Sequence, residues 1–476
     1  MARSEAGVSR RGYPECVDWS TVIGYVVGVV AIAIGLGVSI ALHEWGHLFP
    51  AKRFGVYVPK YMIGFGPTLW SRKIGETEYG FKLLPLGGFV ALSGMYPPAH
   101  DGEAPRDATT ALFESAARDD EAPEGQPRRS AVEAFNAIAL QDEPAEDPKR
   151  MFYLLPWWKR IIVMLGGPVM NLLLAVVAYA IMLCLIGIPQ ETTTIGSVSQ
   201  CALPATSTAT ECGANDPVAP ASAAGIEPGD RLVSIGGTTV TDWVQATGLI
   251  RAEAEQTIPI VVERDGAELT LTATPMRSQR VVIDAQGDPV LDASGKYQYV
   301  DAGFLGISPA YATTPQPVTA VLPQVWSNVT QVGDIIVQLP MRVWDTAVTM
   351  FDPSATRDPN GPLSVVGVGR LAGEITSLDT VPFLDKIGSI IGMFASLNVA
   401  LFVFNLIPLL PLDGGHVIGA VWDALRRGWA RIRQKAMPRP IDISRLTPLT
   451  MAVIGILGVM SVVLILADIV KPISLQ

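Results

Sequence analysis

Four long apolar stretches divide the chain. They cover residues 22–42, 161–188, 387–410 and 446–469, and they contain almost no charged side chains. An α-helix needs about 20 apolar residues to cross the hydrocarbon core of a bilayer. The first stretch is too long for a secretory signal peptide and has no small-residue cleavage site after it, so we expect it to be retained. The pattern predicts an α-helical polytopic membrane protein with about four transmembrane helices.

The segment after the first span has a different pattern. Residues 56–92 contain β-rich runs punctuated by glycines, and the runs 68–73 and 78–84 are joined across Gly75. Such an arrangement is typical of a β-hairpin. Residues 96–147 are rich in Ala, Glu, Asp, Pro and Arg with few large apolar side chains. We expect this acidic insert to be largely disordered and assign it no chemistry.

The segment between the second and third spans is predicted to hold a small domain. In residues 192–275, four strand-like runs frame a helical patch near Trp243, and about 80 residues suit one small domain. The strand-like runs are 194–198, 231–235, 258–263 and 268–273. Residues 317–351 follow as a largely helical, amphipathic stretch. This stretch either lies along the membrane or the spans, or packs on its own domain.

Charge predicts how the chain is oriented. Only 17% of the residues are charged, below the roughly 25% of an average soluble domain. Residues 190–386 carry 10 basic and 22 acidic side chains, whereas residues 417–445 carry seven basic and two acidic ones. Basic short loops stay in the cytoplasm. We therefore expect residues 417–445 and 48–159 to lie inside, and residues 190–386 and both termini outside.

Cysteine is scarce, with four in 476 residues. Cys184 lies within the second span and is interpreted as a small core residue. Cys201 and Cys212 lie in one predicted outer loop, where oxidation is permitted, and we predict a disulfide between them.

The end of the first span carries the residues with recognisable chemistry. His43, Glu44 and His47 form an HExxH pattern. On a helix, positions i and i+4 share a face, so two imidazoles can bind one Zn²⁺ while the glutamate reaches a metal-bound water. Ionisable residues at a span end are costly to bury and are usually functional. The pattern predicts a zinc site.

A hydrolytic zinc usually has a third protein ligand and leaves its fourth position to water. Asp413 is the best third ligand, because it follows the third span where Pro408, Pro411, Gly414 and Gly415 must break the helix. A broken helix at membrane depth is tolerated only where it is buried in protein or lines a cavity. The alternative is an ordinary helix end with a loop aspartate.

These motifs resemble those of the site-2 protease family of intramembrane zinc metalloproteases. The resemblance rests on HEWGH at 43–47 and on the NxxPxxxLDG pattern that begins at Asn405. Gly64-Phe65-Gly66 is similar to the family's membrane-associated hairpin region, and Gly167-Pro-x-x-Asn171 is similar to its second-span motif. The chain departs from the family pattern in the acidic insert and at Pro50, where the zinc helix could end early.

The resemblance implies a role for each matching residue. His43, His47 and Asp413 would bind one Zn²⁺, Glu44 would activate water, and Asn405 would lie beside the substrate carbonyl. Gly64, Phe65 and Gly66 would contact the substrate.

The resemblance also implies a single PDZ module, because residues 221–236 look like part of one. It would act as a size filter, which we prefer, or as a peptide binder. The implied function is regulated intramembrane proteolysis in a bacterial cytoplasmic membrane, with the PDZ domain extracytoplasmic. The implied substrates are membrane proteins such as anti-sigma factors or signal-peptide remnants, sometimes after an upstream site-1 protease. We expect no nucleic-acid partner.

The predicted segments follow from these observations. They are an N-terminal tail (1–20), the first span with HExxH (21–56), the hairpin region (57–95), the insert (96–150), the second span (151–190), the PDZ domain (191–276), an outer linker with amphipathic helices (277–386), the third span (387–416), the basic loop (417–445) and the fourth span with the C-terminal tail (446–476).

Two rival functions remain open on sequence alone. One is a catalytically silent scaffold with a structural zinc, although such sites have four protein ligands, usually including cysteine. The other is a zinc hydrolase of a non-peptide substrate. His416 lies close to Asp413 and is interpreted as a hydrogen-bonding neighbour of the site rather than a spare ligand.

Overall fold

The chain folds into two compact units, one of which is Ile186–Gln316 and the other the remainder. The computed structural model describes residues 19–97, 106–109, 149–202, 212–213, 216–282, 290, 297–352, 357–358, 361–378, 381–438 and 447–473. Most of the predicted N-terminal tail and most of the acidic insert lie outside the described residues.

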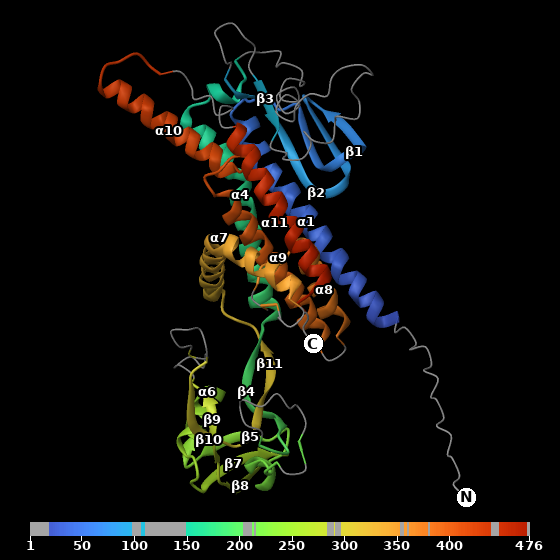
Figure 1. The fold of residues 1–476 in the computed structure, drawn as a ribbon, viewed down its shortest axis with the longest axis vertical. Coiled ribbons are helices and arrows are strands. Elements are labelled where there is room, and N and C mark those ends of the chain that lie inside the picture. The colour runs from blue at the N-terminus through green and yellow to red at the C-terminus, as the bar shows by residue number, and fades with distance from the viewer. Residues whose placement is uncertain are drawn as a thin grey trace, which may run out of the picture. The chain divides into compact units, whose positions relative to one another are not determined.

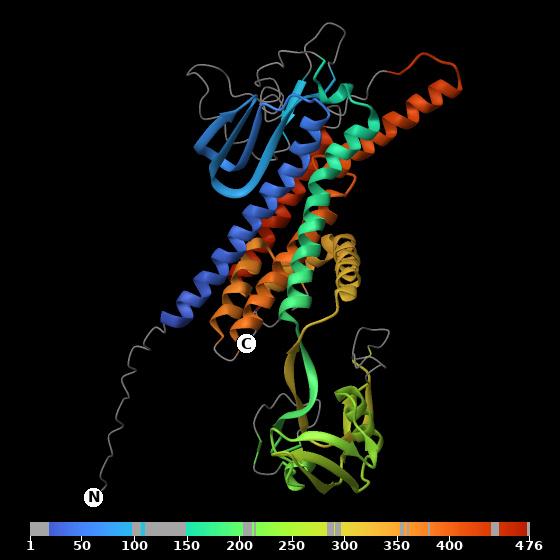
Figure 2. The ribbon, with the colours of Figure 1, turned by 180° about the vertical axis from the view of Figure 1, so that it is seen from behind.

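Four long apolar helices confirm the predicted spans (Figures 1 and 2). They are α1 (Trp19–Arg53), α4 (Trp157–Ala180), which continues as the π-helical turn η3 (Ile181–Ile186), α9 (Phe383–Asn405) and α11 (Thr447–Val470). Helices α7 (Val321–Phe351), α8 (Val365–Ser377) and α10 (Asp413–Ile432) also belong to this unit. The chain is a polytopic membrane protein with a β domain.

Small residues and buried hydrogen bonds bring the helices together, as is usual where lipid removes the hydrophobic driving force between helices. A side chain at Gly28 of α1 would collide with the backbone of Ala372 in α8. Thr376 Oγ1 of α8 donates to the carbonyl of Gly24 at 2.6 Å. In the same way, the buried Asn398 of α9 donates from Nδ2 to Ser39 Oγ of α1 at 2.9 Å.

Helix α7 settles one alternative from the sequence. It packs against α4, α9 and α11. The stretch therefore packs on the spans.

A small antiparallel sheet covers the C-terminal end of α1. It consists of β1 (Lys60–Ile74), β2 (Thr77–Tyr96) and β3 (Arg106–Thr109). The turn between β1 and β2 contains Gly75, as the predicted hairpin requires. Strand β3 lies inside the insert that we expected to be largely disordered. It is ordered because its backbone pairs with Ala91, Leu92 and Tyr96.

Apolar side chains from the sheet, from α1 and α4 and from the segments that follow α1 and precede α4 form one core that fixes the sheet against the helices. Its members are Leu48, Ala51, Val56, Val58, Tyr61, Val90, Leu92, Met95, Phe152, Val163 and Met164.

The second unit is built on a six-stranded sheet of order β11-β4-β5-β7-β8, with β6 beside β5. The strands are β4 (Ile188–Val198), β5 (Arg231–Ile235), β6 (Thr238–Thr239), β7 (Ile258–Arg264), β8 (Ala267–Ala273) and β11 (Ile307–Thr314). Helices α5 (Pro220–Ala223) and α6 (Trp243–Ala252) accompany it, and β9 (Met276–Val281) pairs with β10 (Tyr299–Phe304).

This unit is larger than the predicted 191–276 domain. Strand β11 pairs with β4 along most of its length, so residues up to Gln316 belong to the same unit. Cys201 and Cys212 form a disulfide in it, and within the described residues Cys184 is a free cysteine.

Candidate metal centre

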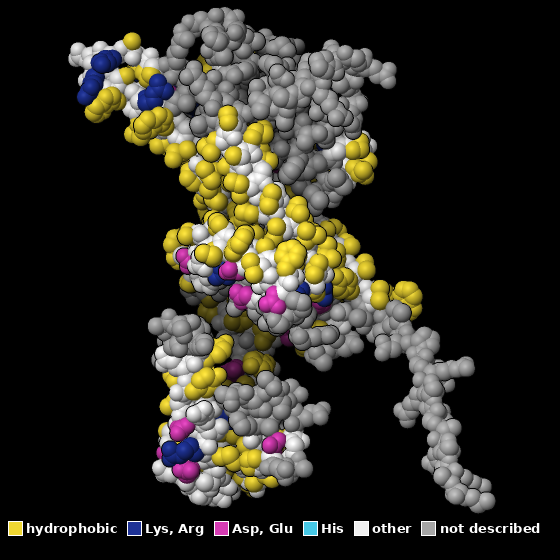
Figure 3. Space-filling view, viewed as in Figure 1, with side chains coloured by type: hydrophobic (Ala, Val, Ile, Leu, Met, Phe, Trp, Pro, Cys, Tyr) yellow, Lys and Arg dark blue, Asp and Glu magenta, His cyan; other side chains and the backbone are white. Residues whose placement is uncertain are grey.

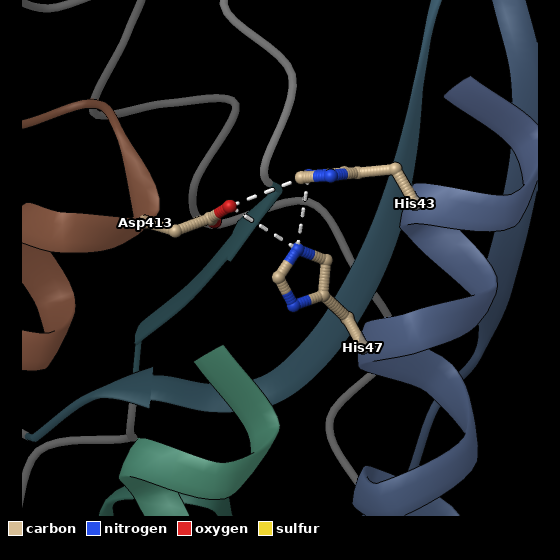
Figure 4. Close-up of side chains that lie close together, drawn as sticks. All are labelled: His43, His47 and Asp413. Atoms are coloured by element: carbon tan, nitrogen blue, oxygen red, sulfur yellow. Dashed lines mark hydrogen bonds and ion pairs between the residues drawn. The ribbon is translucent and has the colours of Figure 1, made fainter. Parts of the chain in front are cut away.

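His43 and His47 lie one turn apart on α1 and present their Nε2 atoms to the same point (Figure 4). The two Nε2 atoms are 3.2 Å apart. His47 is fully buried. Pro50 does not end the helix, which continues to Arg53. Proline has no backbone N–H to donate to the carbonyl of Gly46, four residues earlier. This carbonyl lies against Gly166 of α4, where a Cβ would collide with its oxygen.

Asp413 reaches the histidines because the chain breaks its helix just before it. Helix α9 ends at Asn405, and α10 begins with Asp413 itself. The intervening loop folds back over the first turn of α10, where a side chain at Gly414 or Gly415 would collide with backbone atoms of residues 406–410. These two glycines therefore permit the turn that directs the carboxylate inward.

The three side chains match the donor geometry of a zinc ion. Asp413 Oδ2 lies 3.3 Å from His43 Nε2 and 3.4 Å from His47 Nε2. Donors at about 2.0–2.1 Å from a tetrahedral Zn²⁺ are separated by about 3.3 Å. Asp413 Oδ2 is also buried and has no hydrogen-bond partner in the described part of the chain. A buried carboxylate oxygen of this kind is costly unless a cation compensates it.

Glu44 lies directly beside this centre and is buried. It follows His43 on α1, and a Cβ at Gly88 of β2 would lie 3.2 Å from Glu44 Cγ. The sheet therefore lies immediately over the turn of α1 that carries Glu44. Burial and, next, the charge of Glu44 raise the pKa of Tyr61, so its hydroxyl stays protonated and donates to the carbonyl of Ala41 at 2.6 Å.

Each histidine has a second contact that orients its ring. His47 Nδ1 lies 2.8 Å from the carbonyl of Val163, which accepts only from a protonated Nδ1 and so leaves Nε2 for the metal. His43 Nδ1 lies 3.1 Å from the carboxamide of Asn171. The Asn171 atom at this distance is Nδ2, and its Oδ1 is buried with no hydrogen-bond partner among the described residues. Turned toward His43, this oxygen would accept the Nδ1 proton in the same way.

Sequence reasoning missed these supporting residues. In the sequence, Asn171 and Gly167 stand out only as parts of a motif on the second span. In the structure, a Cβ at Gly167 would lie 2.7 Å from His43 Cε1 and 2.8 Å from His43 Nε2. The motif was the available signal, because small and amide residues within an apolar span are typical of a helix contact.

The other predicted site residues lie outside the donor cluster. Asn405, the last residue of α9, donates from Nδ2 to the carbonyl of Leu401 in its own helix. Gly64 and Gly66 have left-handed backbone conformations in β1. They follow Ile63, which pairs with Gly88 beside Glu44. His416 is not among the three residues grouped as metal donors in the described chain.

Comparison with known proteins shows similarity along most of the chain. The profile of peptidase family M50 matches residues 31–443. The zinc metalloprotease Rip1 of Mycobacterium tuberculosis is 30% identical over 475 residues, which cover 95% of this chain and 99% of Rip1. The zinc metalloprotease RasP of Bacillus licheniformis is 26% identical, with 84% and 90% covered. The metalloprotease MmpA of Caulobacter vibrioides is 25% identical, with 85% and 88% covered.

Proposed function

Because the chain belongs to peptidase family M50, the site-2 protease family, and is a membrane zinc metalloprotease, we propose that it hydrolyses peptide bonds within or beside the transmembrane segments of other membrane proteins. The observation that carries this proposal is the donor triangle of 3.2, 3.3 and 3.4 Å on helices at a span end, with Glu44 beside it. A triangle of these dimensions suits a hydrolytic zinc that keeps one position open.

His43, His47 and Asp413 would hold the metal. When bound, Zn²⁺ supplies a Lewis acid and lowers the pKa of its water toward about 7. Glu44 takes a proton from the attacking water and returns it to the amide nitrogen that leaves, as a general base and then a general acid. Its burial under β2 removes competing solvent from the carboxylate.

Asn405 would bind the substrate carbonyl or the oxyanion through its side-chain amide, an interaction that contributes a few kcal/mol in other hydrolases. In the present structure that amide donates one of its two hydrogens to the carbonyl of Leu401, and the other hydrogen is available to a substrate. A polar group at the end of α9, one short loop before Asp413, supports this role.

The hairpin sheet would hold the substrate in an extended form. A helical substrate has to unwind first, because its carbonyls are engaged within the helix. Residues 61–63 of β1 are paired on both sides, with 79–81 and with 88–90, whereas 68–74 pair only with the 77–82 segment in the described register. The free side of 68–74 offers an edge for strand addition. Gly64, Phe65 and Gly66 lie between this edge and the part of the sheet that contacts Glu44.

We assign the protein to a bacterial cytoplasmic membrane, with its zinc site toward the cytoplasm and the β domain outside. The charge difference between residues 190–386 and 417–445 supports this orientation. Within the β domain, the strands and α6 are compatible with a PDZ module that filters substrates by size. The substrates would be anti-sigma factors or signal-peptide remnants, in some cases after cleavage by a site-1 protease.

The test is cleavage of a defined single-pass membrane protein in proteoliposomes, followed by mass spectrometry of both products. The expected cut lies within or next to the transmembrane segment and is absent with Glu44→Gln. Cleavage confined to a soluble loop far from the membrane would contradict the intramembrane assignment. Deletion of the β domain tests the filter separately, since intact substrates with large outer domains should then be cut.

A further inference from the structure

Helix α10 carries a stripe of apolar side chains that remains exposed in the structure. After its first turn, which holds the metal ligand Asp413, large apolar side chains recur every three or four residues and are more than a third exposed. Such spacing places them on one face of the helix. They are Ile418, Val421, Trp422, Leu425, Trp429 and Ile432.

The opposite face of α10 is the one that packs on the bundle. Asp423, which is fully buried, accepts a hydrogen bond from Arg160 of α4 at 2.6 Å and lies 3.2 Å from Arg427. Ala420 and Ala430 are buried on the same side. This contact fixes the rotation of α10, so the apolar stripe faces away from α4. In Figures 1 and 2 the helix leaves the bundle, and its far end projects from it.

A cluster of cations accompanies the far end of the stripe. Residues 426–435 hold five basic side chains and no acidic one. The guanidinium of Arg433 lies over the ring of Trp429, 4.5 Å from its centroid. Figure 3 shows apolar and basic side chains together on the projecting part of α10. The cations are Arg426, Arg427, Arg431, Arg433 and Lys435.

The composition of α10 favours the surface of a membrane over its interior. Among the described helices, four are long and apolar enough to span a bilayer, and α10 is not one of them. A helix with an apolar face containing tryptophan and with arginines around it is typical of a helix that lies in the lipid headgroup region. Cations next to the membrane are attracted to anionic lipids.

We infer that α10 docks its apolar stripe into the anionic leaflet of the membrane that the spans cross, with the cations among residues 426–435 contacting lipid phosphates. The charge complementarity favours anionic lipid over a second copy of this chain, since two copies would bring like-charged clusters together. This inference goes beyond the proposed function, because it concerns lipid recognition and does not depend on the substrate. Because Asp413 is the first residue of α10, this contact would also anchor the helix that carries Asp413 to lipid.

The test uses the full chain in nanodiscs of phosphatidylcholine, with and without phosphatidylglycerol. A nitroxide is placed on Leu425→Cys, in the stripe, or on Gln434→Cys, an exposed polar position just past the helix, with Cys16 and Cys184 replaced by serine. Power-saturation EPR then measures contact with oxygen, which concentrates in lipid, and with a water-soluble nickel chelate.

The expected result is that the Leu425 label contacts oxygen and loses contact with nickel when the anionic lipid is present, whereas the Gln434 label keeps contact with nickel. Reversing Arg426, Arg431 and Arg433 to glutamate should abolish that protection at low anionic content, because each cation near an anionic surface is worth about a fivefold change in affinity. Arg427 is left intact because it lies beside Asp423.

Three outcomes would overturn the inference. Contact of the Leu425 label with nickel in both lipids would show that the stripe stays in water. Equal protection in both lipids, unaffected by the charge reversal, would show that no anionic lipid is recognised. Protection from both oxygen and nickel would show that protein covers the stripe. Zinc content, measured in parallel, reports on the metal site independently of all three.

Discussion

Replacing Gly167 with alanine is expected to weaken zinc binding, because this glycine allows α4 to pass directly beside both imidazoles. The added methyl would lie 2.7 Å from His43 Cε1, 2.8 Å from His43 Nε2 and closer still to His47 Nε2, whereas ordinary contact begins at 3.4 Å. Relieving the contact with Cε1 alone requires a displacement of about 0.7 Å, several times the roughly 0.2 Å that metal–ligand distances tolerate.

We therefore expect Gly167→Ala to lower zinc affinity and peptide cleavage by about 100-fold, the effect of a misplacement near 1 Å. Competition with a chromogenic chelator in detergent micelles measures the affinity, and size-exclusion chromatography checks that the variant is folded. Gly37→Ala is the matched control, since it changes a glycine of α1 whose added Cβ would meet nothing within 4 Å. Wild-type zinc affinity and activity in folded Gly167→Ala would refute the placement of α4 against the histidines.

Three further outcomes are expected. Asn171→Ala should reduce zinc affinity by about 10- to 100-fold through loss of the partner of His43 Nδ1, measured by the same competition; an unchanged affinity would exclude an orienting role. A hydrogen bond from Arg264 lowers the pKa of Asp230 below its usual 3.8, so the stability that this carboxylate gives the β domain is complete above about pH 4 and is lost as the pH falls through its folded pKa. Asp230→Asn should cost about 2 kcal/mol at neutral pH and flatten that acid dependence, as measured by hydrogen exchange of β5 and β7. Cys212→Ser should destabilise the same unit by about 2 to 3 kcal/mol in the chain-entropy model, as measured by urea denaturation with hydrogen exchange as the probe. Equal stability of the wild-type protein with and without reductant would argue against a stabilising disulfide.

The sequence predicted the parts of the site that depend on local spacing. His43 and His47 share a helix face because they are four residues apart, and this holds wherever the helix lies. The break before Asp413 followed from the proline and glycine residues around it. The four spans could be predicted because each is a continuous apolar run, although the helix ends in the structure differ from the predicted ends by several residues.

The parts that escaped prediction depend on contacts between distant segments. The pairing of β11 with β4 joins residues more than 100 positions apart, so the β domain extends to Gln316 and not to residue 276. Neither the contact of Asn171 with His43 nor the approach of Gly167 has a local signature, because both depend on how α4 packs against α1. Pro50 was expected to limit the zinc helix, but α1 continues through it to Arg53.

The most direct test of the account measures zinc content and peptide cleavage together on purified Glu44→Gln and Asp413→Ala proteins. Glu44 is proposed to act on water without binding the metal, so Glu44→Gln should retain one zinc per chain while cleavage falls by about 10²- to 10⁴-fold. Asp413 is assigned as a direct ligand, so Asp413→Ala should lose both zinc affinity and cleavage. Full cleavage by Glu44→Gln would contradict the proposed mechanism, and unaltered zinc affinity in Asp413→Ala would contradict the metal centre built from His43, His47 and Asp413.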